Sequence, residues 1–190
     1  MQESLIICGV DEAGRGPLAG PVVAAAVILP DNHDIAGLAD SKKLSAKRRA
    51  ELDIQIRSQC AFGVGVGEAD EIDRINILQA TMQAMIRAVD AISGSFDRVH
   101  VDGNRLPEWP HKAEAIIGGD ASDPAISAAS IIAKEHRDRL MAELAGEDDL
   151  YGWRRNKGYG TKEHMAALET YGATPQHRRS FAPVARALAS

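Results

Sequence analysis

Two short apolar runs enclose a glycine-rich stretch near the start of the chain, and this arrangement most constrains the fold. The runs, residues 5–8 and 22–29, are bounded by turn residues, as buried strands are. Residues 9–20 between them read GVDEAGRGPLAG and predict a tight connection between the two strands. Asp11 and Glu12 then follow the end of the first strand. Because side chains alternate along a strand, both acids point the same way only if the chain turns between them, which the glycines allow.

Adjacent carboxylates at the edge of an apolar layer are costly unless they are paired, and a bound cation is one of the few partners that offset this cost. The alternative is a surface turn that carries an ordinary acidic pair. The stretch around Asp11 and Glu12 does not by itself separate these two interpretations. Acidic residues further along the chain favour the first.

Composition places the chain among one-domain α/β proteins. Its 190 residues suffice for one well-buried domain, and a content of 45% hydrophobic but only 4% aromatic residues predicts an aliphatic core of helices packed on a sheet. Cys8 and Cys60 lack metal-type spacing and are expected to be buried free thiols. No apolar run reaches about 18 residues, and Met1–Ser4 lack the basic region of a secretory signal. These features predict a cytoplasmic protein.

The charge is distributed unevenly along the chain. The net charge is −5, which is not typical of a simple polyanion binder. From Trp153 onward, however, seven Lys or Arg residues stand against two acidic ones. An acidic body with a basic tail could hold cations at one site and phosphates at another, although a solvated basic face would look the same.

The remaining pattern predicts an α/β domain over residues 1–149 with a C-terminal helical extension over residues 150–190. Glycines alternate with larger residues over 62–67, which favours a strand packed closely against a helix rather than a phosphate loop. The expected strands are 5–8, 22–29, 62–67, 98–102 and 113–117, and the expected helices are 45–59, 70–92, 124–144, 161–171 and one from residue 183.

Four acidic residues stand at or next to predicted strand ends, namely Asp11, Glu12, Asp102 and Asp120. If these strands are neighbours in one sheet, the acids converge, and they could not all stay ionised without a countercharge. Hard oxygen ligands without a His/Cys cluster favour Mg²⁺ or Mn²⁺ over zinc. One or two such ions held by carboxylates are typical of a site that hydrolyses phosphodiesters.

Seven motifs in this order resemble those of bacterial ribonuclease HII and span nearly the whole chain. A lone Asp-Glu pair would be weak evidence, but seven motifs in the same order are hard to obtain by chance. The motifs are Asp11–Val22, Asp40–Leu44, Val101–Gly103, Gly119–Asp120, Ala128–Lys134, Gly158–Thr161 and His177–Phe181.

The resemblance implies an RNase H-like fold, with a mixed five-stranded sheet flanked by helices. It implies an endonuclease that cuts the RNA strand of RNA–DNA hybrids, and also ribonucleotides embedded in duplex DNA, leaving 3′-hydroxyl and 5′-phosphate ends. In the family's pattern the four acids hold the Mn²⁺ or Mg²⁺ ions, and Gly14, Arg15 and Gly16 contact the ribose 2′-hydroxyl. Tyr159 packs on the following deoxyribose.

The basic residues at family positions are expected to contact phosphates. These are Lys42, Lys43, Arg178 and Arg179. The expected partners are the hybrid and ribonucleotide-containing DNA, and not a membrane. The chain ends Arg186–Ser190 without a Gln-x-x-Leu-x-x-Phe-Phe tail for a sliding clamp, and a monomer is expected.

Three other interpretations remain open. The same fold could serve a Holliday-junction resolvase or another metal nuclease of the RNase H superfamily. A hybrid-binding protein could carry the metals for structure alone. A metal-dependent phosphatase would act on small substrates, but the basic C-terminal segment would then lack an evident role.

Overall fold

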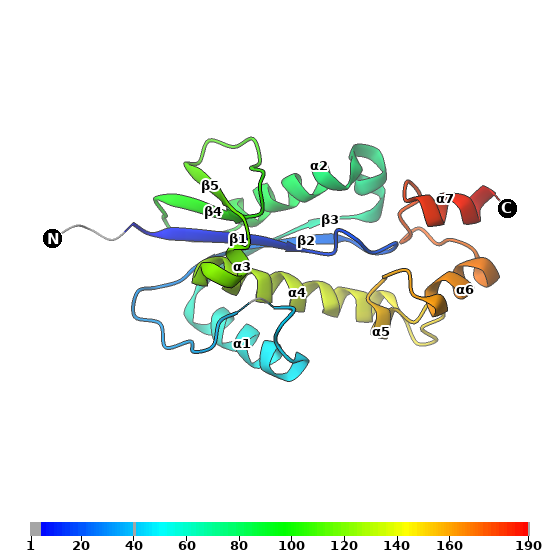
Figure 1. Ribbon diagram of the computed structural model, residues 1–190, viewed down its shortest axis with the longest axis horizontal. Helices are drawn as coiled ribbons and strands as arrows, with labels where there is room; N and C mark the ends of the chain where they lie inside the picture. The colour runs from blue at the N-terminus through cyan, green and yellow to red at the C-terminus, as the bar shows by residue number, and fades with distance from the viewer. Residues whose placement is uncertain (1–4, 40, 190) are drawn as a thin grey trace.

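The computed structural model describes residues 5–39 and 41–189; Met1–Ser4, Asp40 and Ser190, which belong to the expectations above, lie outside this part. One mixed sheet of five strands has the order β3-β2-β1-β4-β5. It is flanked by helices on both faces (Figure 1), so the predicted sheet is confirmed. Its strands are β1 (Ile7–Ala13), β2 (Val22–Ile28), β3 (Ala61–Gly67), β4 (Arg98–Asp102) and β5 (Ala113–Ile116).

The sheet combines an antiparallel half with a parallel half. β1 pairs antiparallel with β2, and β2 pairs antiparallel with β3. On the other side of β1, β4 runs parallel to it, and β5 runs parallel to β4. The carboxyl ends of β1, β4 and β5 therefore meet at one end of the sheet.

The two faces of the sheet bury separate aliphatic clusters. Helix α2 (Ala69–Asp90) packs on one face, and α4 (Pro124–Leu144) with α1 (Ala46–Gln59) covers the other (Figure 1). Alternate residues of β2 face opposite ways: Ala24 and Ala26 lie in the α2 cluster, and Ala25 and Val27 in the α4 cluster. A strand buried on both faces accounts for the uninterrupted apolar run in its sequence.

The glycines of β3 let the backbone of α2 approach the sheet, as the alternation predicted. A Cβ atom on Gly65 would lie 2.0 Å from the carbonyl oxygen of Ala84, and one on Gly63 would lie 2.1 Å from that of Ala88. Real Cβ atoms do not come this close to a backbone oxygen, so any larger residue would push the helix away.

We therefore expect Gly65→Ala to lower the free energy of unfolding by about 1–3 kcal/mol through overpacking. Gly67→Ala is the matched control, because its added Cβ would meet the side chain of Val22 at 3.0 Å and no atom closer. Urea unfolding of the two variants measures the difference. An equal effect at both positions would contradict the close helix approach at Gly65.

The observed elements depart from the predicted ones mainly near the acids. β1 does not end at Cys8, as predicted, but continues to Ala13, so the chain does not make the turn between the two acids that the glycines would have allowed. Asp11 and Glu12 consequently point to opposite faces of the sheet. Asp120 lies in a one-turn helix, α3 (Gly119–Ser122). Helix α2 is kinked at Asn76, whose φ of 69° and side-chain bond to the Gln79 amide begin a second helical segment.

Three further helices follow residue 150, namely α5 (Trp153–Asn156), α6 (Lys162–Tyr171) and α7 (Ala182–Ala189). They lie beyond the end of the β1–β2 hairpin (Figure 1). The hairpin loop reaches into them: Leu18 packs with Leu168 and Val184, and Ala19 packs with Trp153. The loop between the two strands thus has its own apolar contacts with the C-terminal helices.

Cys8 is buried as predicted, but Cys60 is only partly buried, and both are free thiols. Burial raises the pKa of Cys8 to about 12 and that of Cys60 to about 11. Neither is a reactive thiolate near neutral pH. Separately, no helix within residues 5–39 and 41–189 has the length and hydropathy of a membrane span.

Candidate active site

Three carboxylates converge at the carboxyl ends of the parallel strands. Oxygen atoms of Asp11, Asp102 and Asp120 all lie within 4.8 Å of one another. Val10 is paired with Val101, so the next residues, Asp11 and Asp102, stand side by side. The amide of Asp120 donates to the Asp102 carboxylate over 3.3 Å. Residues far apart in the sequence thus form one acidic cluster, which we call the aspartate cluster.

Glu12 lies beside the aspartate cluster but is not one of its three members. Its carboxylate is 3.4 Å from the Arg15 guanidinium. It lines a cavity on the α2 side of the sheet, of about 290 Å³, together with Asp102 and Arg105. Burial raises the pKa of Glu12, the positive charge of Arg15 opposes that shift, and the negative charge of Asp102 adds to it.

The aspartate cluster holds several negative charges close together around the buried side chain of Asp11. Asp11 is only 5% exposed. Burial raises its pKa well above the usual range, and the charges of Glu12 and Asp102 raise it further. A hydrogen bond of 2.7 Å from the amide of Glu12 opposes these effects. The Lys42 ammonium is 4.0 Å from the Asp120 carboxylate but stands largely in solvent. Three convergent carboxylates in this condition fit a divalent cation with oxygen ligands.

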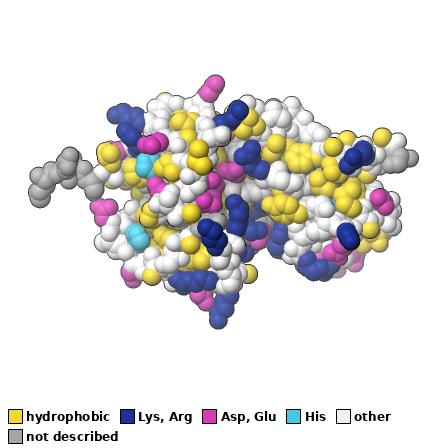
Figure 2. Space-filling view, in the orientation of Figure 1, with side chains coloured by type: hydrophobic (Ala, Val, Ile, Leu, Met, Phe, Trp, Pro, Cys, Tyr) yellow, Lys and Arg dark blue, Asp and Glu magenta, His cyan; other side chains and the backbone are white. Residues whose placement is uncertain are grey.

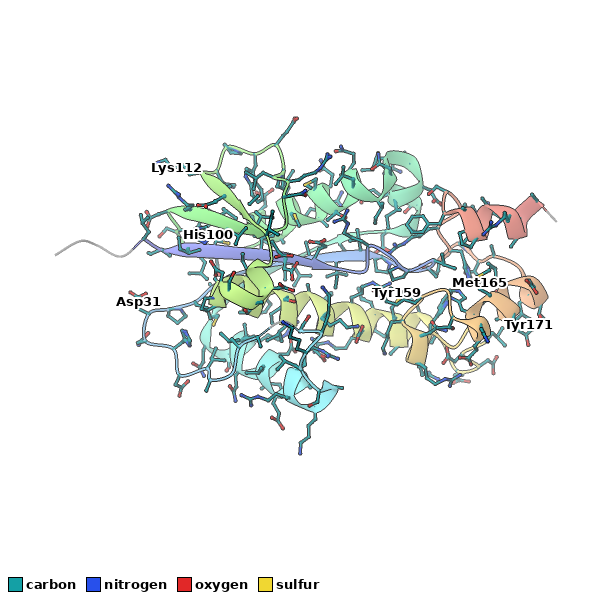
Figure 3. All side chains as sticks on the ribbon, viewed as in Figure 1. Asp31, His100, Lys112, Tyr159, Met165 and Tyr171 are labelled. Atoms are coloured by element: carbon teal, nitrogen blue, oxygen red, sulfur yellow. The ribbon has the colours of Figure 1, made fainter. Side chains whose placement is uncertain are left out.

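A second cavity, of about 260 Å³, opens on the α4 side of Glu12. The glycine-rich loop forms one wall through Gly14, Arg15 and Gly16, and Lys42 and Tyr159 are among the residues that line the remainder. Tyr159 is 49% exposed, and a Cβ on Gly16 would touch its ring at 3.4 Å. Figure 3 shows Tyr159 where the sheet meets the C-terminal helices. We call this space the loop cavity.

Arg178 does not reach the surface where phosphates could bind, so its predicted phosphate contact is wrong in this structure. Its side chain is 0% exposed. The guanidinium donates to the carbonyl oxygens of Gly14 (2.6 Å), Arg15 (3.0 Å) and Gly20 (2.9 Å). Arg178 therefore stabilises the glycine-rich loop from its buried side.

Arg137 holds the same loop from α4, and the sequence analysis missed it. Its guanidinium donates to the carbonyls of Ala19 (3.2 Å), Pro21 (2.8 Å) and Lys157 (2.9 Å). Burial lowers the pKa of Arg137 to about 10 and that of Arg178 to about 9. The sequence did contain a signal: Arg137 lies four residues after Ala133 and four before Met141, so it stands on the buried side of its helix.

The other predicted phosphate contacts lie at the surface. Lys42, Lys43 and Arg179 are exposed. The backbone amide of Arg179 donates to the Asp73 carboxylate on α2 over 2.9 Å, which anchors the basic segment to the core. In Figure 2 basic side chains gather beside acidic ones in the middle of the displayed face.

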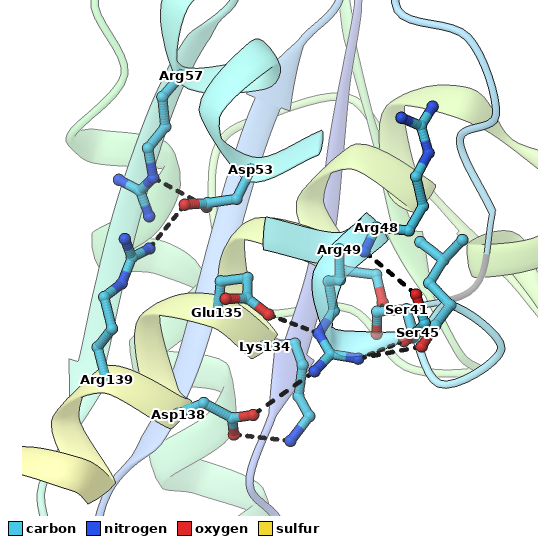
Figure 4. A network of polar contacts seen from close by, with 12 residues as sticks. Ser41, Ser45, Arg48, Arg49, Asp53, Arg57, Lys134, Glu135, Asp138 and Arg139 are labelled. Carbon is cyan, nitrogen blue, oxygen red and sulfur yellow. Dashed lines mark hydrogen bonds and ion pairs between the residues drawn. The ribbon is translucent and has the colours of Figure 1, made fainter. Parts of the chain in front are cut away.

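Arg49 fixes the segment that carries the two lysines. Its guanidinium donates to Glu135 on α4 (2.6 Å) and to the carbonyls of Ser41 (3.1 Å) and Leu44 (3.3 Å) (Figure 4). The Ser41 hydroxyl lies 2.8 Å from that of Ser130, which in turn hydrogen bonds to Asp11. The segment that precedes α1 is thus connected to the aspartate cluster through hydrogen bonds.

Comparisons with known proteins agree with this geometry. The family model described as Ribonuclease HII matches residues 8–184. A relative from Sphingopyxis alaskensis, named Ribonuclease HII, is 62% identical over 181 residues, covering 95% of this chain and 91% of that protein. The crystal structure of ribonuclease H2 from Pyrococcus horikoshii superimposes with a TM-score of 0.79 at 26% identity, covering 95% and 96% of the two chains. A PCNA:RNase HII complex from Archaeoglobus fulgidus gives a TM-score of 0.75 at 27% identity, covering 93% and 95%.

The RNase H fold and its aspartate cluster define a metal-dependent nuclease. The match over nearly the whole length is more specific than that class. The chain belongs to the ribonuclease HII family, and membership implies cleavage of RNA–DNA hybrids. The predicted fold and enzyme class are therefore confirmed.

Proposed function

We propose that this protein is an endoribonuclease that cuts the RNA strand of RNA–DNA hybrids and also cuts at single ribonucleotides embedded in duplex DNA. Hydrolysis would leave 3′-hydroxyl and 5′-phosphate ends. The observation that carries the proposal is the position of the loop cavity beside the aspartate cluster: Glu12, which follows Asp11, and Ser130, which hydrogen bonds to Asp11, both line the cavity. A sugar bound in the loop cavity would place the neighbouring phosphodiester next to the aspartate cluster.

The proposed metal ligands are Asp11, Glu12, Asp102 and Asp120, which would hold one or two Mg²⁺ or Mn²⁺ ions. Bound ions supply Lewis-acid stabilisation to the reacting phosphodiester and activate water for hydrolysis. The protein's own contribution is to hold these carboxylates in place. The pairing of β1 with β4 and the amide of Asp120 on Asp102 support this assignment.

The glycine-rich loop is the proposed reader of the 2′-hydroxyl. Gly14 has φ of +93°, a conformation that favours glycine, and glycine lets a ribose approach the backbone closely. The 2′-hydroxyl is the group that separates RNA from DNA. Carbonyls of Gly14 and Arg15 already accept hydrogen bonds from Arg178, so the loop is fixed before substrate arrives.

The decisive assay compares four substrates in Mg²⁺ and in Mn²⁺. They are a duplex with one embedded ribonucleotide, the matched all-DNA duplex, an RNA–DNA hybrid and an all-DNA four-way junction. We expect cutting of the first and third only, with products that a ligase joins through their 5′-phosphates. Cutting of the all-DNA junction at a similar rate would favour a resolvase and overturn the proposal. Binding without cutting would favour a hybrid-binding protein instead.

Tyr159→Ala is expected to reduce the preference for a ribonucleotide followed by deoxyribose by about tenfold while binding changes less. The aromatic ring offers an apolar surface that suits a sugar without a 2′-hydroxyl, and alanine removes that surface. Tyr159→Phe is the matched control and should keep the preference, since the ring remains. The measurement is the ratio of two kcat/KM values, one for a duplex in which a ribonucleotide is followed by deoxyribose and one for a uniform RNA–DNA hybrid. We call this ratio the junction preference. Unchanged preference in Tyr159→Ala would exclude this role.

Lys42 is proposed to contact a phosphate next to the aspartate cluster, and Lys43 and Arg179 phosphates further out. We expect Lys42→Ala to weaken duplex binding and to reduce the slope of log K against log salt by about 1. Lys162→Ala, in the first turn of α6, is the control and should leave this slope unchanged. An unaltered slope in Lys42→Ala would remove this residue from the interface.

The proposal includes a monomer acting in the cytoplasm, whose reducing conditions suit two free thiols. The solved Archaeoglobus fulgidus relative is in a complex with PCNA.

A further inference from the structure

Two buried histidines lie behind the loop that carries Tyr159, and the proposed function gives them no role. His164 is 0% and His177 1% exposed, and they pack with Tyr151 and Trp153. The Nε2 atoms of the two histidines are 3.1 Å apart. A continuous chain of hydrogen bonds passes through both rings, so their protonation states are linked to the loop.

The two ends of the chain fix the tautomer of each ring. The amide of Thr174 can only donate, and it lies 3.0 Å from Nδ1 of His177, so that nitrogen accepts and Nε2 carries the proton of a neutral ring. The carbonyl of Tyr159 can only accept, and it lies 2.9 Å from Nδ1 of His164. His164 therefore carries its proton on Nδ1 and offers the lone pair of Nε2.

These assignments agree at the centre of the chain. Nε2 of His164 receives hydrogen bonds from Nε2–H of His177 and from the indole of Trp153, which can only donate (3.2 Å). Every donor then meets an acceptor. A further proton on His164 would face two N–H groups. A further proton on His177 would face the Thr174 amide and could be accepted only by the Thr174 hydroxyl, 3.0 Å away. Either charge breaks at least one hydrogen bond of the chain.

We propose that His164 and His177 are positioning residues that hold the Tyr159 loop through the Tyr159 carbonyl, and that they do so only as a neutral pair with opposite tautomers. Other contacts hold the loop as well: the Tyr159 amide donates to the Asn156 carbonyl (2.9 Å), and Arg137 donates to the Lys157 carbonyl (2.9 Å). The Thr161 amide also donates to the Tyr159 carbonyl (2.8 Å), and the Gly158 carbonyl accepts from Leu18 (2.8 Å). This inference rests on the proposed role of Tyr159 as the sugar contact.

The surroundings of the pair favour the neutral state. Burial lowers the pKa of both rings, to about 4 for His177, and a charge on His164 would lower the pKa of His177 further. Hydrogen bonds with the backbone at Tyr159 and Gly158 oppose the shift of His164, and one with Thr174 opposes that of His177, but burial is the largest cause for both. Glu163 on α6 favours a charged His164, but that carboxylate is half-exposed and paired with Arg155. The Tyr151 hydroxyl bonds to the Gly172 carbonyl, and the Arg178 guanidinium points at the glycine-rich loop. No described acid forms an ion pair with either histidine within residues 5–39 and 41–189.

The first test is NMR of the full-length protein with ¹⁵N-labelled histidine, without metal. Two-bond ¹H–¹⁵N spectra distinguish the tautomers. We expect His164 as Nδ1–H and His177 as Nε2–H, with neither titrating between pH 8 and 5.5. Variants His164→Asn and His177→Gln assign the signals. A titration near pH 6.5 for either ring, or the same tautomer in both, would overturn the proposal.

The second test asks whether the histidine pair affects the preference for a ribonucleotide followed by deoxyribose. His164→Leu removes the donor to the Tyr159 carbonyl and should lower the junction preference about tenfold, as Tyr159→Ala does. His164→Asn places an amide N–H where Nδ1 stood and should restore most of the preference. His136→Asn, on the partly exposed side of α4, is the control. If Tyr159→Ala lowers the preference and His164→Leu does not, the positioning role is wrong. If Tyr159→Ala has no effect, the proposed function is wrong at that residue, and the NMR result still decides the state of the pair.

Acid sensitivity provides a third readout that needs no substrate. Histidines in the unfolded chain take up protons near pH 6.5, whereas the folded pair does so only at lower pH. The pair therefore contributes stability that is present above pH 6.5 and is lost as the pH falls toward 4. Urea unfolding measures the fall of the unfolding free energy between pH 6.5 and pH 4. We expect this fall to be clearly smaller in a His164→Asn, His177→Gln double variant than in the wild type. Equal losses in both proteins would contradict a neutral pair.

Discussion

Replacing Asp11 by Asn is expected to reduce cleavage of an RNA–DNA hybrid by at least about 10³-fold. Metal-assisted charge stabilisation of this kind is worth several kcal/mol in the transition state. Asp11 is the most buried member of the aspartate cluster, and its pKa is raised by burial and by the charges of Glu12 and Asp102. The neutral amide keeps the shape of the side chain but removes one charge from the cation site. Single-turnover cleavage in saturating Mn²⁺ measures the effect.

The same variant should be at least as stable as the wild type when metal is absent. Removing one of several crowded negative charges relieves repulsion, and the wild type recovers that cost only when a cation binds. We therefore expect Mn²⁺ to raise the Tm of the wild type and to raise that of Asp11→Asn much less. Asp70→Asn, a change at an exposed residue of α2, is the control. Undiminished cutting by Asp11→Asn would rule out its assignment as a metal ligand.

Replacing Arg178 by Met is expected to lower the free energy of unfolding by about 2–4 kcal/mol. The change leaves the buried carbonyl of Gly20 and the partly buried carbonyls of Gly14 and Arg15 without their donor, at about 1–3 kcal/mol for a fully buried group and less for the other two. Part of that loss is recovered, because a buried guanidinium no longer has to be desolvated. Urea unfolding of the metal-free protein measures the net change.

The neighbouring residue supplies a matched control for Arg178. Arg179→Met removes an identical side chain that is exposed, and we expect it to change the unfolding free energy by less than about 0.5 kcal/mol. Arg178→Lys keeps the positive charge but cannot reach three carbonyls with one ammonium, so most of the loss should remain. If Arg178→Met and Arg179→Met have the same stability, the loop does not depend on the buried guanidinium.

Much of the fold could be predicted because it depends on local patterns. Residues 22–29 form an uninterrupted apolar run, and the structure contains β2 there, buried on both faces. Pro124 at the first turn and the small apolar face after it mark α4 correctly. The resemblance implied a mixed five-stranded sheet, but the strand order was not predicted, because local patterns do not contain it. The kink at Asn76 was missed, because the apolar spacing of α2 continues through it.

The candidate site could be predicted in part. That Asp11, Asp102 and Asp120 come together follows from parallel neighbouring strands that end at the same edge. The position of Glu12 on the opposite face did not follow, because it depends on whether β1 turns or continues after Val10. The His164–His177 chain was also missed, since thirteen positions separate the rings in the sequence and only the packing of α6 brings them into contact.

The sequence by itself determined the elements, the acids and the family, because periodicity, strand ends and motif order are written along the chain. Only the tertiary structure decided which of two adjacent, identical side chains is buried, Arg178, and which is exposed, Arg179. The bridge between Ala19 and His177 sets the register of the basic segment against the hairpin loop. That register turns Arg178 into the loop and leaves Arg179 in solvent. A contact between segments some 160 residues apart, as from Arg178 to Gly20 and Gly14, is a property of packing, and no local pattern encodes it.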